Sequence, residues 1–123
     1  MLAIKCFAEG GYKVVEVENK LEVLQKEVGG YIEVLPCASD GTVIICNEEG
    51  KINNLPVNRS VFTDIHRGGA ANWDIICGDF IICGTDGQEF ADLNDSRLKD
   101  LDEQLKKRMH APLRFFREVN ADD

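Results

Sequence analysis

Two apolar runs constrain the fold of this chain more than any other feature. Residues 42–46 read TVIIC, and residues 74–84 read DIICGDFIICG, two near copies of one apolar phrase. Because neighbouring residues of a strand point to opposite faces of a sheet, a strand that is apolar at every position is covered on both faces. We therefore expect residues 42–46 to lie centrally in a sheet. Residues 74–84 are expected to form two strands of the same core, with a bulge or tight bend at Gly78-Asp79.

The segments before the first apolar run predict two hairpins with a short helix between them. AEGG, residues 8–11, separates two β-branched runs and has the glycines of a tight turn. Asn19 then precedes an amphipathic segment with Glu22 at capping-box spacing, and Gly29 is a typical helix stop. A second hairpin follows, with SDG, residues 39–41, as its turn.

The second half of the chain predicts a further hairpin and one long helix. NEEG, residues 47–50, has the residues of a type I turn, and KIN after it is a candidate return strand. Residues 59–66 are compatible with one or two helical turns. Asn94 is a candidate cap for a helix with apolar residues at helical spacing, and Pro112 ends it.

These elements together predict the α+β class. We expect a mainly antiparallel sheet with a short helix after the first hairpin and a C-terminal amphipathic helix, both helices packed on one face. A chain of 123 residues is the size of one domain. We assign residues 1–110 to a single α+β domain and residues 111–123 to a C-terminal extension, in which RFFR is a candidate final strand, dimer contact or phosphate grip.

The charge of the chain is unevenly placed. The net charge is −8, yet residues 106–117 carry five basic residues and no acidic one. An acidic body repels a phosphate backbone, which disfavours binding to duplex nucleic acid in general. No apolar run approaches the ~20 residues that span a bilayer, and the first residues lack the pattern of a signal peptide. We therefore expect a cytoplasmic protein that does not bind membranes, and the possibility of a homo-oligomer stays open.

The residues that usually hold metals or act as nucleophiles are not arranged for either task. The five cysteines are an odd number without CxxC spacing, and four of them lie in apolar runs, which favours buried reduced thiols. His66 and His110, the only histidines, do not form a ligand-spaced pair. Neither a metal nor a cofactor is predicted, and no nucleophile elbow, phosphate-binding loop or dinucleotide motif is present.

One polar stretch, residues 44–59, is the strongest candidate site. Turn chemistry explains Asn47 and Gly50, but it does not explain why an arginine follows the structured LP pair. An arginine fork is well suited to phosphates and carboxylates. We interpret the stretch as a ligand-binding surface, while a structural Arg–Glu clamp would give the same letters. The predicted site residues are Asn47, Glu48, Glu49, Lys51, Asn58 and Arg59.

Three blocks of the sequence also resemble a known family. They are LEVLQKEVGGYIEVLP, IICNEEGKINNLPVNR and DIICGDFIICGTDGQEFADLNDSRLKDL. In this order they resemble small uncharacterised proteins of phages, prophages, plasmids and other mobile elements, over about residues 1–108. The chain departs from that pattern at residues 62–73 and in the tail from Pro112. The family has no assigned reaction, so the resemblance implies no catalytic residue. It implies an accessory protein of a mobile element, often one that counters host defence.

The leading hypothesis is therefore a non-enzymatic phage or mobile-element accessory protein. It would bind a host component or a small nucleotide-like ligand through the predicted site. One alternative is an acidic decoy of a DNA-binding host protein, because residues 1–105 carry 19 acidic and 9 basic residues. Another is a metal-dependent hydrolase using Glu48 or Glu49. It is disfavoured because adjacent residues of a strand point to opposite faces.

Overall fold

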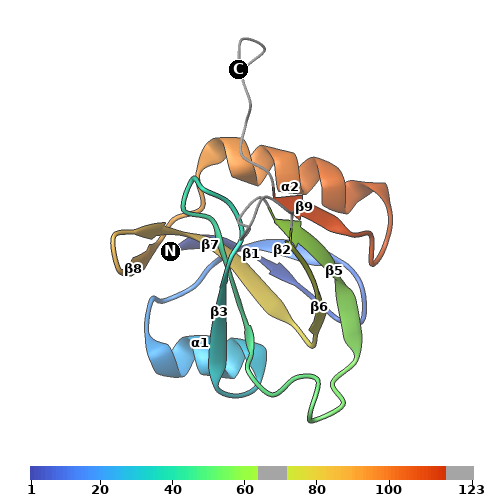
Figure 1. Ribbon diagram of the computed structural model, residues 1–123. Coiled ribbons are helices and arrows are strands. Elements are labelled where there is room, and N and C mark those ends of the chain that lie inside the picture. Colours follow the sequence, from blue (N-terminus) through green and yellow to red (C-terminus); the bar gives the residue numbers. More distant parts are fainter. Residues whose placement is uncertain (64–71, 116–123) are drawn as a thin grey trace.

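The computed structural model describes residues 1–63 and 72–115, which form two β-sheets and two α-helices (Figure 1). The elements are β1 (Leu2–Cys6), β2 (Tyr12–Glu16), α1 (Leu21–Val28), β3 (Ile32–Pro36), β4 (Val43–Asn47), β5 (Val57–Thr63), β6 (Asn72–Cys77), β7 (Phe80–Asp86), β8 (Glu89–Ala91), α2 (Asp95–Lys107) and β9 (Leu113–Phe115). The larger sheet has the order β2-β1-β7-β4-β3, with β8 paired to β7, and the smaller has the order β6-β5-β9. The predicted α+β class and the mainly antiparallel pairing are confirmed.

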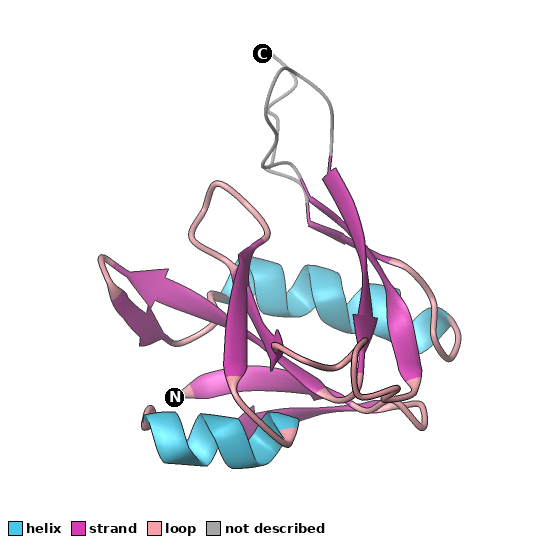
Figure 2. Cartoon of the chain, turned by 60° about the horizontal axis from the view of Figure 1, so that its bottom comes forward, coloured by secondary structure: helices cyan, strands magenta, loops and turns pink. Residues whose placement is uncertain are grey.

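The apolar strands of the larger sheet are covered on both faces, as their sequence predicts. In β4, Val43 and Ile45 face one cluster of buried residues, and Ile44 and Cys46 face the other. The first cluster contains Leu24 and Val28 of α1, and the second contains Leu101 and Leu105 of α2. The sheet therefore separates the two helices, as Figures 1 and 2 show. The expectation that both helices pack on one face is wrong, because each helix covers one of the two apolar faces of the same strands.

The smaller sheet completes the core on the α2 side. Val61 of β5, Ile76 of β6 and Leu113 of β9 belong to the same buried cluster as Leu101 of α2. The chain crosses from the smaller to the larger sheet at Gly78, whose φ of +86° is accessible to glycine at little cost. The predicted bend between the two IIC phrases is thus confirmed.

The helix ends agree with the predictions in part. Asn94 caps α2, because its side-chain oxygen accepts a 2.7 Å hydrogen bond from the backbone N–H of Arg97. Gly29 ends α1 in the left-handed conformation. The residue at the α1 N-cap is Lys20, without a side-chain cap, and the Asn19 amide instead donates to the carbonyl of Phe90 in β8. The predicted Asn19 cap is therefore wrong.

Residues 48–54 are a connection between the two sheets and not a hairpin tip. The predicted turn at its start is present, since the N–H of Gly50 donates to the carbonyl of Asn47. The chain then continues through further turns, and Leu55 N–H closes them on the Gly50 carbonyl. Because β4 and β5 belong to different sheets, no return strand forms at residues 51–53. The predicted hairpin is wrong.

The segment predicted as helical turns from residue 59 is also different. Residues 57–63 form β5, the central strand of the smaller sheet, and residues 64–66 lie outside the described residues. β5 alternates buried and less buried residues from Arg59 to Thr63, a period of two that the helical interpretation missed.

The C-terminal residues up to 115 are part of the fold. β9 pairs in parallel with β5, and Leu113 and Phe115 are fully buried. Arg114, between them, lies over the ring of Phe62 at 4.9 Å from its centroid. The expected domain boundary at residue 110 therefore cuts through the smaller sheet, and the final-strand interpretation of the RFFR segment holds for residues 114–115. Residues 116–123 lie outside the described residues.

Candidate functional site

Asn47, the first predicted site residue, has its side chain committed to the fold. It is buried at the end of β4, where its amide donates to the carbonyl of Val28 at 3.2 Å and its oxygen accepts from the N–H of Glu49 at 2.8 Å. These two bonds join the end of α1 to the turn that follows β4. Gly30 lies so close that a Cβ there would be 2.8 Å from the Asn47 amide nitrogen. Asn47 therefore positions backbone and is not presented to a ligand.

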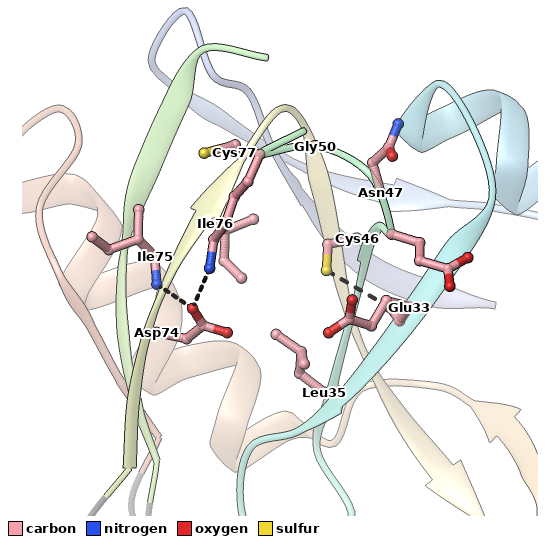
Figure 3. A pocket seen from close by; sticks show the side chains of 11 residues that line it. Glu33, Leu35, Cys46, Asn47, Gly50, Asp74, Ile75, Ile76 and Cys77 are labelled. Atoms are coloured by element: carbon pink, nitrogen blue, oxygen red, sulfur yellow. Dashed lines mark hydrogen bonds and ion pairs between the residues drawn. The ribbon is translucent and has the colours of Figure 1, made fainter. Parts of the chain in front are cut away.

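Two of the charged residues of the predicted site lie at a small pocket between β3–β4 and β6 (Figure 3). Glu48 and Lys51 line it, and the Lys51 ammonium lies 2.8 Å from an oxygen of Asp74 on β6. Glu48 and Glu49 are both exposed. Within residues 1–63 and 72–115, no three His, Cys, Asp or Glu side chains are grouped to hold a metal ion.

Asn58 links the two sheets from the inside. It is 1% exposed, and its amide donates to the carbonyls of Cys6 at 3.1 Å and Gly78 at 2.9 Å. Its side-chain oxygen accepts from Nε of Arg59 at 2.8 Å. One asparagine thus joins β5 to β1 and to the bend before β7, which leaves no amide group for a ligand.

Arg59 combines burial with two terminal guanidinium nitrogens that form no hydrogen bond among the described residues. It is 3% exposed, and Nε is bonded to Asn58, yet no carboxylate of the described residues lies within 4.0 Å of its guanidinium nitrogens. The two terminal nitrogens of Arg59 have no hydrogen-bond acceptor in the described part of the chain. Neither nitrogen is fully enclosed by protein atoms, so both keep some accessible surface. Burial lowers the pKa of Arg59, but an arginine stays charged at neutral pH.

Arg59 lines a cavity of about 240 Å³. The cavity is open on one side and lies between the β1–β2 hairpin, β5 and the C-terminal end of α2. Its lining contains three cationic side chains and no carboxylate. We call it the Arg59 pocket, and its lining residues are Gly11, Tyr12, Arg59, Leu105, Lys106, Arg108 and Met109.

A carboxylate just outside this lining organises one wall of the Arg59 pocket. Asp102 accepts a 2.6 Å hydrogen bond from the Tyr12 hydroxyl and pairs with Lys106, one helical turn further along α2, at 2.8 Å. Lys106 and Tyr12 hold the pKa of Asp102 below its usual value, and Asp102 raises the pKa of both partners. The Tyr12 ring is thereby fixed beside the cationic groups.

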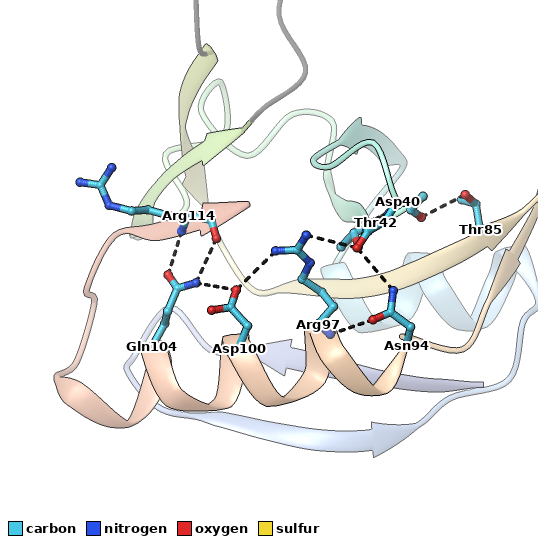
Figure 4. A network of polar contacts seen from close by, with 9 residues as sticks. Asp40, Thr42, Thr85, Asn94, Arg97, Asp100, Gln104 and Arg114 are labelled. Carbon is cyan, nitrogen blue, oxygen red and sulfur yellow. Dashed lines mark hydrogen bonds and ion pairs between the residues drawn. The ribbon is translucent and has the colours of Figure 1, made fainter. Parts of the chain in front are cut away.

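The other buried arginine of the described residues has carboxylate partners. Arg97 on α2 pairs with Asp40 at 3.2 Å and with Asp100 at 3.3 Å, in a network that ties α2 to the β3–β4 turn (Figure 4). Burial raises the pKa of Asp40, but hydrogen bonds from Thr42 and the charge of Arg97 outweigh this and lower it overall. Arg97 serves the fold, and the contrast shows how unusual the surroundings of Arg59 are.

The thiols are reduced and mostly buried, as the sequence predicts. All five are free, and only Cys77 is partly exposed. Burial raises the pKa of Cys6, Cys46 and Cys83 to about 12. Since the thiolate is the nucleophile, these side chains behave as small apolar groups.

The strongest candidate site in the structure is therefore the Arg59 pocket, and not the whole of residues 44–59. Of the six predicted residues, Asn58 and Arg59 lie together, and the hydrogen bond from Arg59 to Asn58 positions the guanidinium. The other four residues lie around or beside the pocket of Figure 3. Sequence reasoning missed Lys106, Arg108 and Tyr12 as neighbours of Arg59. The one available signal was the basic segment that begins at Lys106 in an otherwise acidic chain.

One of three comparisons with known proteins finds a match. The sequence model of a family described as "Domain of unknown function (DUF3846)" matches residues 6–106. No curated protein and no solved structure matches the chain. Neither α1 nor α2, the helices within residues 1–63 and 72–115, has the length and apolar character needed to span a bilayer.

Proposed function

The chain belongs to the DUF3846 family, a domain of unknown function, and from this premise we propose that it binds a small anionic, nucleotide-like ligand in the Arg59 pocket without transforming it. The observation that carries the proposal is the buried guanidinium of Arg59. Its terminal nitrogens have no acceptor among the described residues, and Arg59 lines a cavity together with two further cations.

The energy of the buried charge supports this proposal. Removing a charge from water costs several kcal/mol unless an opposite charge or a set of hydrogen bonds compensates it. Within the described part of the chain, Arg59 has one hydrogen bond, to Asn58, and no ion pair. An anion in the Arg59 pocket would supply both kinds of compensation, since a guanidinium binds phosphate or carboxylate with two parallel hydrogen bonds.

The neighbouring side chains favour binding over catalysis. Lys106 and Arg108 are cationic hydrogen-bond donors, and the Tyr12 hydroxyl is engaged by Asp102. Tyr12 carries the one hydroxyl of this lining, and its partner Asp102 is also paired with Lys106, which lowers the pKa of the carboxylate and makes it a weaker general base. The biological setting that fits such a binder is an accessory protein of a phage or mobile element, countering host defence by holding a host nucleotide-like molecule.

The test is retention of a ligand by purified protein after incubation with bacterial extract. The protein is desalted and denatured, and the released small molecules are identified by mass. Wild type and Lys107→Gln should retain the same anionic compound, because Lys107 is exposed and does not line the pocket. Arg108→Gln removes the same charge at the neighbouring position in the sequence, but Arg108 lines the pocket, so this variant should retain less of the compound. Arg59→Gln should retain none of it. Equal retention by all four folded proteins would refute the proposed site.

A specific observation keeps a second candidate function, the acidic decoy of a DNA-binding host protein, under consideration. Outside the basic segment the chain is strongly acidic, with a net charge of −8 overall. A decoy should bind a basic protein with an affinity that falls steeply as salt rises. Binding that is insensitive to salt would count against the decoy and leave the Arg59 pocket unaffected.

A further inference from the structure

We infer that the anion accepted by the Arg59 pocket is a terminal phosphate monoester, and neither an internal phosphodiester nor a carboxylate. This inference rests on the function proposed above, since it names the ligand class of the same pocket. Three features of the pocket lead to it: the depth of Arg59, the balance of charges around it, and the number of donors that converge there.

The depth of Arg59 selects for the end of a molecule. Only 3% of the residue is exposed, and its Nε side is closed by Asn58, which is itself 1% exposed. A ligand group must therefore enter the cavity to reach the terminal nitrogens. A monoester carries its organic group on one oxygen and can point the other three inward. An internal diester has chain on two oxygens, so fewer of its oxygens can turn toward Arg59 inside a cavity of about 240 Å³.

The charge balance favours a dianion. Arg59, Lys106 and Arg108 line the pocket, and among the described residues Asp102 is the carboxylate bonded to this lining, while Glu103 acts on Lys106 through its charge alone. Three positive charges and one negative charge leave an excess of two. A phosphate monoester carries close to two negative charges above its second pKa of about 6. A carboxylate or a phosphodiester carries one and leaves a cation uncompensated.

The donor count distinguishes phosphate from carboxylate independently. The free side of the Arg59 guanidinium is a planar fork that takes two oxygens. A carboxylate has no third oxygen, so Lys106 and Arg108 would have to share the acceptors that Arg59 already uses. A phosphate monoester offers a third terminal oxygen to these two side chains.

The mouth of the pocket fits an organic substituent on that phosphate. Leu105, Met109 and the ring of Tyr12 form its less polar part, and Met109 is 65% exposed. Met109 also packs on the β1–β2 turn, where a Cβ on Gly10 would collide with its sulfur. A planar group such as a nucleobase or phenyl ring can contact this thioether and ring.

The experiment compares four probes by isothermal titration calorimetry with the full chain at pH 8: phenyl phosphate, inorganic phosphate, diphenyl phosphate and benzoate. We expect phenyl phosphate to bind at least about tenfold more tightly than diphenyl phosphate or benzoate, in keeping with a difference of one charge-assisted hydrogen bond. Inorganic phosphate should fall between them. If diphenyl phosphate or benzoate binds as tightly as phenyl phosphate, the monoester inference is wrong while the anion site stands. If no probe binds, the proposed function fails and the inference with it.

Matched variants assign the binding to this pocket. Arg108→Gln should weaken phenyl phosphate at least about threefold, and Lys107→Gln should change it less than about twofold, although both lose one exposed charge. Arg59→Lys keeps the charge but loses the fork, and should weaken binding about tenfold or more. If Arg59→Lys does not fold, the comparison of Arg108→Gln with Lys107→Gln still tests whether phenyl phosphate binds in this pocket. Equal losses of affinity in these two variants would overturn the assignment.

Discussion

Replacing Asn58 by alanine tests whether its amide serves the fold or a ligand. The substitution removes the bonds to the Cys6 and Gly78 carbonyls and to Arg59 Nε, all of them among buried groups. Each such bond contributes about 1 kcal/mol net, and a buried partner left unsatisfied costs about 1–3 kcal/mol. Asn58→Ala should therefore lower the free energy of unfolding by about 3–5 kcal/mol, a large part of the stability of a domain this size.

The assay is urea unfolding followed by circular dichroism and tryptophan fluorescence. The matched control is Asn53→Ala in the turn between β4 and β5, where the side chain is exposed, and it should stay within about 0.5 kcal/mol of wild type. The Asn58→Ala midpoint should fall with little change in slope. A loss below about 1 kcal/mol would refute the structural role, because a ligand-facing amide would leave the free protein nearly unaffected.

Three further predictions concern positions outside the Arg59 pocket. Gly50→Ala should cost about 1–3 kcal/mol of stability in the same assay, since its Cβ would lie 2.7 Å from the backbone oxygen of Cys77, and an unchanged midpoint would contradict this contact. Thr42 and Arg97 lower the pKa of Asp40 in the folded protein. The stabilisation by the Asp40 carboxylate is therefore fully present above its unfolded pKa of about 3.9, and it is lost as the pH falls through the lower, folded pKa. Asp40→Asn should flatten the acid limb of a stability–pH profile, and an identical limb would argue against the ion pair. Glu48→Gln should change neither stability, by more than about 0.5 kcal/mol, nor phenyl phosphate binding, because Glu48 is exposed and lines the other pocket.

Much of the fold could be predicted from local patterns. A strand apolar on both faces, such as residues 43–46, must be covered on both, and it is. The Asn94 cap and the Gly29 stop are decided within one turn of chain, so their chemistry is visible in the letters. The errors arose where the partner is distant. Residues 51–53 have no strand to return to, because β4 and β5 belong to different sheets.

The candidate site shows the same limit more sharply. The letters of Asn58 and Arg59 indicated that an amide and a guanidinium lie together, and they do. Whether the amide of an asparagine is hydrogen-bonded to backbone carbonyls depends on segments that are distant in the sequence. For Asn58 these segments are β1 and the bend before β7. The meeting of Arg59 with Lys106 and Arg108 depends on how α2 lies over the sheets, and no local pattern encodes that placement.

The most direct test of the central claim observes the guanidinium of Arg59 itself. In ¹⁵N-arginine-labelled protein, side-chain resonances assigned through Arg59→Lys are followed while phenyl phosphate is added. The account predicts saturable shifts of the terminal Arg59 nitrogens and of Arg108, with the Nε–H bonded to Asn58 protected from exchange throughout. Phenyl phosphate that binds the protein while the Arg59 resonances stay unmoved would show that the buried arginine is not the anion site.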